Sequence, residues 1–248
     1  MKRNLSTVWL GIAALACAVP AMGSVVVDGY TWDYAYTGDV LPTAASPAWT
    51  SFESGSASAS GGKLTIDTNT TDGRYFQIDE GGAWNPESGS VTWVQTGVQV
   101  NSQSSEGVYP NDSRFATGIY IGGAGKSVSL NFGTYNDGSG LKTGVFDRLH
   151  QLITEVNVFQ YHTYRVSLDP SNSQYTLYVD SFATPVKVGT TDSDAYGMYF
   201  GDGSGNTRGS ADWDYIAWNN ATAPVAVPEP AALGLLGFSA LALRRRRA

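Results

Sequence analysis

Paired carboxylates are the first residues to consider for chemistry in this chain. Glycoside hydrolysis uses two carboxyl groups, which lie about 5 Å apart in enzymes that retain the anomeric configuration. The nearest acidic pair is Asp79 and Glu80, in the segment FQIDEGG. Adjacent residues on a β-strand project to opposite faces of a sheet, and the two glycines that follow indicate a strand end. The pair therefore does not favour a catalytic role.

Other patterns of catalysis and ligand binding are also incomplete. The two histidines, His150 and His162, lack a second ligand at metal-binding spacing such as H-x-x-x-H. The segment DGSGN lacks the G-x-S-x-G spacing of a nucleophile elbow. Asn206 stands where a dinucleotide fingerprint needs its third glycine, and no βαβ unit surrounds it. An EF-hand count that begins at Asp202 fails, because Thr207 replaces the turn glycine.

Short β-strands are the elements that must position any functional side chains. Segments of strand-like pattern recur along the chain with turn residues between them. The segment KSVSLNF places Val128, Leu130 and Phe132 on one face. A hairpin is predicted from 162–168 and 174–179, across the turn DPSNS. Residues 145–158 fit helical and strand spacing equally well, so both interpretations stay open. Further strands are expected at 64–68, 74–78, 91–100, 115–121, 182–188 and 211–218.

Ten or more short strands within about 200 residues predict an all-β domain over residues 24–222. Two packed antiparallel sheets in a jelly-roll sandwich suit this content. The serine-rich segment SGSASASGG is expected to be a surface loop, and ATAPVAVPEP a linker between the body and the tail.

Three segments in order resemble the concanavalin A-like, laminin-G-type jelly roll: GGKLTIDT, YHTYRVSLDPSNSQYTLYVDS and MYFGDGSGNTRGSADWDYIAWNN. The hairpin ends in a Y-x-D turn at Tyr178-Val179-Asp180, and the last strand reads W-D-Y-I from Trp213. Laminarinase-type hydrolases of this fold carry E-x-D-x-x-E on one strand. That motif does not occur in this chain, so an enzyme is not the expected outcome.

The same resemblance implies a possible calcium ion. It names Asp214 as a ligand, with Asp28 or Asp33 as partners from the N-terminal strand. Asp202, Asn206 and Asp212 lie near enough in sequence to contribute if the loop folds back. The competing interpretation makes the 202–206 segment a solvated turn and Asp214 a hydrogen-bonded edge residue.

Aromatic residues suggest a way to bind a glycan. Trp84, in the loop GGAWNPESGS, is the best candidate for an exposed stacking surface, because glycine and proline flank it. Other aromatic residues sit in strand patterns and are expected in the core: Trp93, Trp213, Trp218, Tyr164 and Tyr175.

The N-terminal segment has the plan of a secretory signal peptide over residues 1–23. Lys2 and Arg3 precede an apolar run, and small residues end at Gly23. The single cysteine, Cys17, lies inside the run, and Ala14 stands where a lipobox needs leucine. Without the leader and the tail, nine basic and 21 acidic residues remain, a balance of about −12. Nucleic acid is not an expected partner of so acidic a body.

The C-terminal segment, residues 223–248, contains three parts in a fixed order. Pro228, Glu229 and Pro230 come first, an apolar run expected to form a hydrophobic helix follows, and four arginines close the chain: Arg244, Arg245, Arg246 and Arg247. This order resembles the PEP-CTERM sorting signal of Gram-negative bacteria. The resemblance implies an exosortase-type processing enzyme as a partner and a transient stay in the membrane. It also implies a final place in the cell envelope, at the cell surface or in the extracellular matrix.

Together these features predict an exported, non-catalytic protein that associates with exopolysaccharide. Two alternatives stay open. One is a polysaccharide hydrolase or lyase with unrecognised carboxylates, and the other is a purely structural or adhesive matrix protein.

Overall fold

A computed structural model describes residues 24–69, 73–103, 113–194, 197–202 and 208–228. The predicted leader and the tail from Glu229 onward, including the four arginines, lie outside the described residues. Pro228 is the last described residue and is exposed. Within the described part, no helix is long and apolar enough to cross a membrane.

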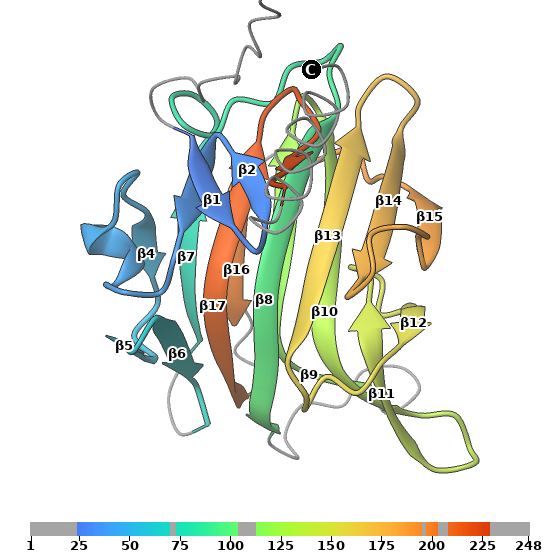
Figure 1. Ribbon diagram of the computed structural model, residues 1–248. Coiled ribbons are helices and arrows are strands. Elements are labelled where there is room, and N and C mark those ends of the chain that lie inside the picture. Colours follow the sequence, from blue (N-terminus) through green and yellow to red (C-terminus); the bar gives the residue numbers. More distant parts are fainter. Residues whose placement is uncertain (1–23, 70–72, 104–112, 195–196, 203–207, 229–248) are drawn as a thin grey trace, which may run out of the picture.

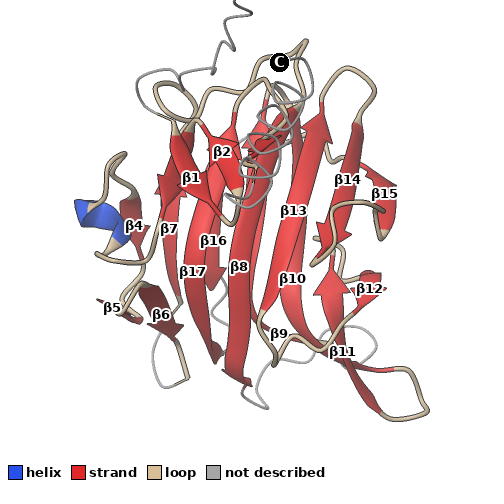
Figure 2. Cartoon of the chain, viewed as in Figure 1, coloured by secondary structure: helices blue, strands red, loops and turns tan. Residues whose placement is uncertain are grey.

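The fold is an antiparallel two-sheet jelly-roll sandwich, which confirms the predicted class (Figure 1). The front sheet follows the order β15-β14-β13-β8-β17-β6-β5, with β3 paired to β17, and the back sheet follows β12-β11-β10-β9-β16-β7-β4. A small third sheet, β1-β2-β18, lies in front of β17 and β8. The only helix among the described residues is a short 3-10 turn, Pro42–Ala44 (Figure 2).

The front-sheet strands are β15 (Lys187–Thr190), β14 (Gln174–Val179), β13 (His162–Asp169), β8 (Thr92–Gln103), β17 (Gly209–Asn219), β6 (Lys63–Asp67), β5 (Ser56–Ser60) and β3 (Tyr34–Tyr36). The back-sheet strands are β12 (Leu152–Glu155), β11 (Leu141–Phe146), β10 (Lys126–Asn136), β9 (Arg114–Gly123), β16 (Met198–Asp202), β7 (Arg74–Ile78) and β4 (Thr50–Phe52). The small sheet contains β1 (Val25–Val27), β2 (Tyr30–Trp32) and β18 (Val225–Ala226).

Alternating apolar residues build the core between the two sheets. Val128, Leu130 and Phe132 of β10 are all buried, as their spacing predicts. The predicted hairpin is also confirmed, because β13 and β14 pair from Tyr164↔Val179 to Asp169↔Gln174. Aromatic rings fill the centre, where Phe200 and Trp213 lie 5.0 Å apart between ring centroids.

Residues 145–158, for which the sequence leaves helix and strand both open, contain the end of β11, a turn at residues 147–151 and β12, and no helix. Three segments differ from their predictions. The strand expected at 182–188 is β15, which begins only at Lys187 and runs to Thr190. Part of the serine-rich segment forms the edge strand β5, paired to β6, rather than a loop. Val225 and Ala226 of the expected linker pair with β2, and the Val227 N–H donates to the Gly29 carbonyl over 2.8 Å. Backbone pairing decides where these segments form strands. In β5 the serine–alanine alternation matches the burial, with Ala57 and Ala59 packed against the core.

A pair of glycine substitutions tests the packing of the back sheet. Gly133 lies at a register shift between β10 and β9, where a Cβ atom would overlap the Arg114 carbonyl. Gly133→Ala is expected to lower the free energy of unfolding by about 1–3 kcal/mol or more in urea denaturation. The control, Gly89→Ala, adds a Cβ atom in open space and should change the value by less than about 0.5 kcal/mol. Equal stabilities of the two variants would contradict the register.

Candidate functional site

A β-bulge in β17 determines which side chains reach the front face. Trp213 pairs with Val98 and Tyr215 pairs with Gly97, so Asp214 is an extra residue between the two pairs. Trp213 and Ile216 are fully buried in the core. A bulge lets two consecutive side chains share one face of a sheet. Asp214 and Tyr215 therefore both project forward.

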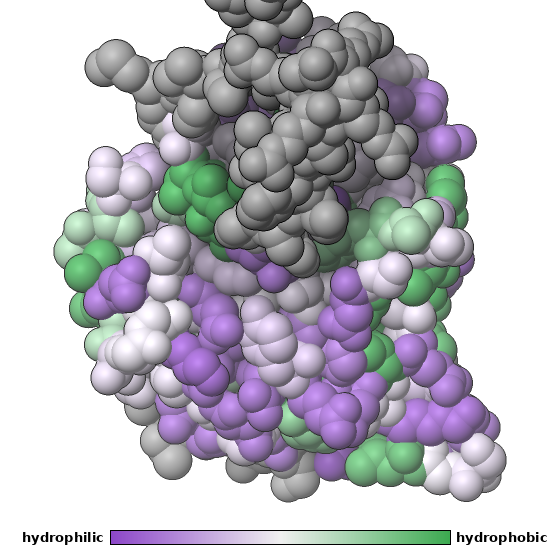
Figure 3. Space-filling model, in the orientation of Figure 1, coloured by the Kyte–Doolittle hydropathy of each residue, from purple (hydrophilic) through white to green (hydrophobic). Residues whose placement is uncertain are grey.

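The lower half of the front face is open and polar (Figure 3). We call its described members the front-face patch: Lys63, Thr65, Gln99, Tyr161, Asp212 and Asp214. Asp212 pairs in register with Thr65 on one side and with Gln99 on the other. The Thr65 hydroxyl donates to Asp212 Oδ1 over 2.7 Å, and Lys63 Nζ lies 4.0 Å from Asp214 Oδ1. Pairing across strands thus fixes these groups relative to one another.

Tyr161 provides the aromatic surface of the patch. Its side chain is 42% exposed, and its hydroxyl lies over Gly97, where any other residue would place a Cβ atom against it. Burial raises the pKa of Tyr161 to about 12, and the carboxylates of Asp214 and Asp28 add to that rise. The phenol therefore stays neutral and can donate a hydrogen bond at any physiological pH.

Asp214 also has a shifted pKa. Burial raises the pKa of its carboxyl above the usual 3.8, while the Lys63 ammonium acts in the opposite direction. Asp212 and Asp214 sit two residues apart and share the front face. The sequence patterns named both residues as candidate calcium ligands but not as a carboxylate pair, because the search for such a pair used a longer motif. The alternation signal in D-W-D, with a core tryptophan between two acids, could have revealed it.

The small sheet covers the upper half of the front face. Its residues Val27 and Trp32 pack on Tyr215 and Ala217 of β17 in a separate apolar cluster. The patch lies below this cover and stays accessible.

Beneath the small sheet lies a clamp around Arg165 of β13, which is only 5% exposed. The Arg165 guanidinium carbon stands 3.6 Å from the ring centroid of Phe182 and 3.9 Å from that of Tyr30. Arg165 Nε donates to Gln95 Oε1 over 2.8 Å. The two rings and this hydrogen bond hold the buried cation, although Arg165 Nη2 is buried without a hydrogen-bond partner among the described residues. The contact with Tyr30 fastens the small sheet to the sandwich.

The residues named for calcium do not gather at one place: Asp214 lies in the patch, Asp28 and Asp33 flank the small sheet, and Asp202 ends β16 of the back sheet. Asp28 Oδ2 accepts hydrogen bonds from Gln95 Nε2 and from the Tyr215 hydroxyl. Asp33 is exposed, and its backbone N–H donates to Asn219 Oδ1. Asp202 is buried and accepts a bond from the Thr68 hydroxyl. Asn206 lies outside the described residues. In the described part of the chain, no three His, Cys, Asp or Glu side chains gather to hold a metal ion, so calcium stays a prediction.

Trp84 is not the exposed stacking surface that its flanking residues suggested. Its side chain is fully buried in the main core, and its Nε1–H donates to the Gly122 carbonyl over 2.9 Å. The Gly81 N–H donates to the Trp84 carbonyl, which closes a turn that folds the indole inward. Glycine and proline signal a loop correctly, but they do not say which way its aromatic side chain points. Of the aromatics expected in the core, Trp93 alone is not buried.

A row of aromatic rings crosses the outer face of the back sheet. Phe52 stacks on Tyr75 and Tyr120 stacks on Tyr199, with centroids 4.9 and 4.6 Å apart and planes 8° apart in each pair. In each stacked pair, one face of each ring is covered by its partner ring. The row therefore stabilises neighbouring strands and offers little flat surface to a sugar.

Comparisons with known proteins concern the architecture. No protein-family model matches the chain, and no curated protein matches it. A native glycosidic hydrolase structure matches 81% of this chain and 100% of its own at 12% identity, with a TM-score of 0.46. An endo-1,3-beta-glucanase from Streptomyces sioyaensis matches 78% of this chain and 97% of its own at 12% identity, with a TM-score of 0.43. A sialidase matches 68% of this chain and only 16% of its own at 12% identity, with a TM-score of 0.41. At this similarity the matches assign neither an activity nor a substrate to this chain.

The raised pKa of Asp214 predicts a pH-dependent effect on stability in calcium-free buffer. At a pH below the usual pKa of 3.8, the carboxyl is neutral in the folded and unfolded chains alike. Its contribution to the free energy of unfolding is then fully present. As pH rises through the raised folded pKa, that contribution is lost, because the unfolded chain ionises more easily. The free energy of unfolding of Asp214→Asn should therefore be close to that of the wild type at ~pH 3 and higher than that of the wild type at ~pH 7.

Added calcium gives the control for that experiment. If Asp214 binds calcium, Asp214→Asn should be less stable than the wild type at neutral pH when the ion is present. The substitution then removes a ligand that stabilises the folded state. A wild-type melting midpoint that calcium and chelator leave unchanged would remove the calcium hypothesis.

Proposed function

We propose that this protein is exported and associates with exopolysaccharide in the cell envelope or extracellular matrix through the front-face patch. The observation that carries the proposal is the open half of the front sheet. There Asp212 and Gln99 are partners on the paired strands β17 and β8, and the neutral phenol of Tyr161, just before β13, lies over Gly97 of β8. The leader, the cysteine-free body and the tail support export and sorting by an exosortase-type enzyme.

The chemistry of the patch suits a chain of sugar hydroxyls. Carboxylates accept hydrogen bonds, amides and hydroxyls do both, and a partly exposed tyrosine ring adds apolar contact for the C–H face of a pyranose. The acidic balance of the body repels polyanions. A neutral or cationic polysaccharide is therefore the partner that fits best.

Retention on polysaccharide beads tests this function. Tyr161→Ala should weaken retention of the full-length protein about tenfold, equivalent to about 1.4 kcal/mol, because it removes the aromatic contact and one donor. The matched control is Phe52→Ala, which removes an exposed ring from the back sheet and should leave retention unchanged. Equal losses in the two variants would contradict a role for the patch.

A second candidate function rests on the pair Asp212 and Asp214. One carboxyl accepts a bond from Thr65, and the other has a raised pKa, which is the division of roles that glycoside hydrolysis needs. Reducing-sugar release, measured beside retention, separates the alternatives. Retention without release supports binding alone. Release abolished in Asp212→Asn and Asp214→Asn supports hydrolysis. If the protein is not retained and releases no sugar, a purely structural matrix protein is favoured.

The tail makes a separate prediction about processing. Replacement of Pro228, Glu229 and Pro230 by alanine should leave the protein uncut in the membrane fraction, because the sorting enzyme would no longer find its motif. The control is Pro224→Ala, a proline change upstream of β18 that should be processed normally. Immunoblots of membrane and secreted fractions report both. Normal processing of the triple variant would contradict the sorting signal.

A further inference from the structure

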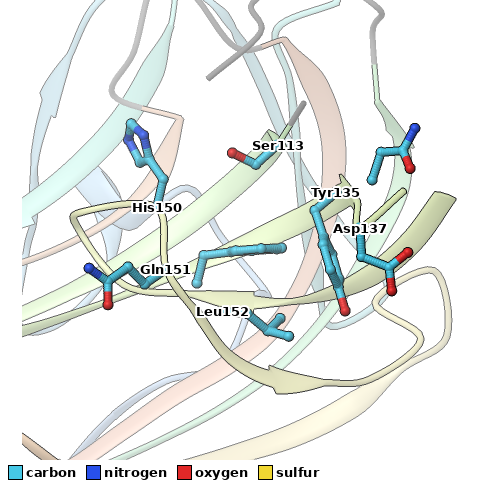
Figure 4. Close-up of a pocket in the computed structure, with 8 residues that line it drawn as sticks. Ser113, Tyr135, Asp137, His150, Gln151 and Leu152 are labelled. Atoms are coloured by element: carbon cyan, nitrogen blue, oxygen red, sulfur yellow. The ribbon is translucent and has the colours of Figure 1, made fainter. Parts of the chain in front are cut away.

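A pocket lies on the back sheet where β10, β11 and β12 meet, away from the front-face patch. Its volume is about 410 Å³, and Ser113, Tyr135, Asp137, Phe146, His150 and Gln151 contribute to its lining. Figure 4 shows His150 and Gln151 on one side, with Tyr135 and Asp137 on the other. Small-molecule sites span roughly 300–1,000 Å³, so the pocket is large enough for a small ligand.

Aromatic side chains form the apolar wall of this pocket. Phe115, Tyr135 and Phe146 make a cluster of their own, separate from the main core. The ring of Phe146 lies 5.1 Å from that of Phe115 and 5.5 Å from that of Tyr135. Their neighbour Val145 is buried in the main core, so alternation turns Phe146 to the outer side of the sheet.

A tight turn holds His150 at the opposite side. His150 has a φ of +63°, in the left-handed region that non-glycine residues rarely occupy. Asp147 fixes the turn: its Oδ1 accepts hydrogen bonds from the N–H groups of Leu149 and Gln151, both over 2.8 Å. The imidazole packs 5.2 Å from the Phe115 ring. Strain of this kind persists where the surroundings enforce it, often at a binding site.

The polar groups on the other side are also fixed. The Tyr135 hydroxyl donates to Glu155 Oε1 over 2.7 Å, and Lys142 Nζ lies 2.8 Å from Asp137 Oδ2 and 3.2 Å from Glu155 Oε1. The lysine offsets part of the acidic charge. Burial lowers the pKa of His150, against the smaller opposing effect of Asp147. This favours the neutral imidazole, which can both donate and accept.

We propose that this pocket binds a single neutral pyranose ring, such as a terminal or branch residue of a glycan. Only Phe146 and Leu152 of its eight lining residues lack a polar side-chain atom, so most of the wall can address hydroxyl groups. The aromatic cluster supplies the apolar contact that a pyranose C–H face needs. Asn136, Asp137 and Gln151 are exposed to water. An apolar ligand that covered them would remove that water without replacing its hydrogen bonds, at a cost of about 1–3 kcal/mol for each group.

The proposal goes beyond polymer association at the front face, because the pocket lies on the other sheet. Saturation-transfer NMR and calorimetry would use the full-length protein with the methyl glycosides of glucose, galactose, mannose and N-acetylglucosamine. At least one glycoside should bind saturably. His150→Gly and Gln151→Ala should each weaken the affinity for that glycoside about tenfold, equivalent to about 1.4 kcal/mol.

His150→Gly keeps the experiment decisive, because glycine adopts the left-handed conformation without strain and the turn should still form. Its melting midpoint shows that the fold persists while the imidazole is gone. The control is Tyr161→Ala, which should lose bead retention and keep glycoside binding, so failure of one site is distinguishable from failure of the other. Binding of none of the glycosides, or equal binding by wild type and both pocket variants, would overturn the proposal. Binding of cyclohexanol in place of every glycoside would overturn the sugar class.

Discussion

The extra residue in β17 is the constraint on which the arrangement of the front sheet depends. Strand β17 pairs with β8, β6 and β3, so any change in its register would propagate to three neighbours. By absorbing Asp214 as a bulge, the strand keeps Trp213 and Ile216 in the core. The same bulge turns Asp214 and Tyr215 outward together. Tyr215 then supports the small sheet, and Asp214 joins the open patch.

The sequence predicted the strands of the sandwich well, because apolar residues with a period of two determine which side of a sheet is buried. β10, β13 and β14 carry that period without interruption, and all three lie within one or a few residues of their expected bounds. The predictions failed at edge strands that are very short or contain only small side chains. The edge strand β5 contains only serine and alanine, and β18 contains two residues.

The candidate sites were harder to predict, for different physical reasons. Trp84 sits in a correctly predicted loop, but a closing hydrogen bond turns its indole inward. The bulge that unites Asp214 with Tyr215 depends on pairing with Gly97, which lies far away in sequence. The back-sheet pocket requires a turn whose histidine adopts a left-handed conformation. Periodicity contains no information about any of these features.

Strand β18 has a mechanical consequence for the way the body is held. β18 pairs with one edge of β2, and β1 pairs with the other edge. Both ends of the described body therefore lie in the same small sheet. A force applied to the C-terminal end first loads the few hydrogen bonds between β18 and β2, including that from Val227 to Gly29. These can break while the sandwich beneath stays closed. A pull on this end is therefore expected to open the pairing of β18 with β2 before it strains the two large sheets.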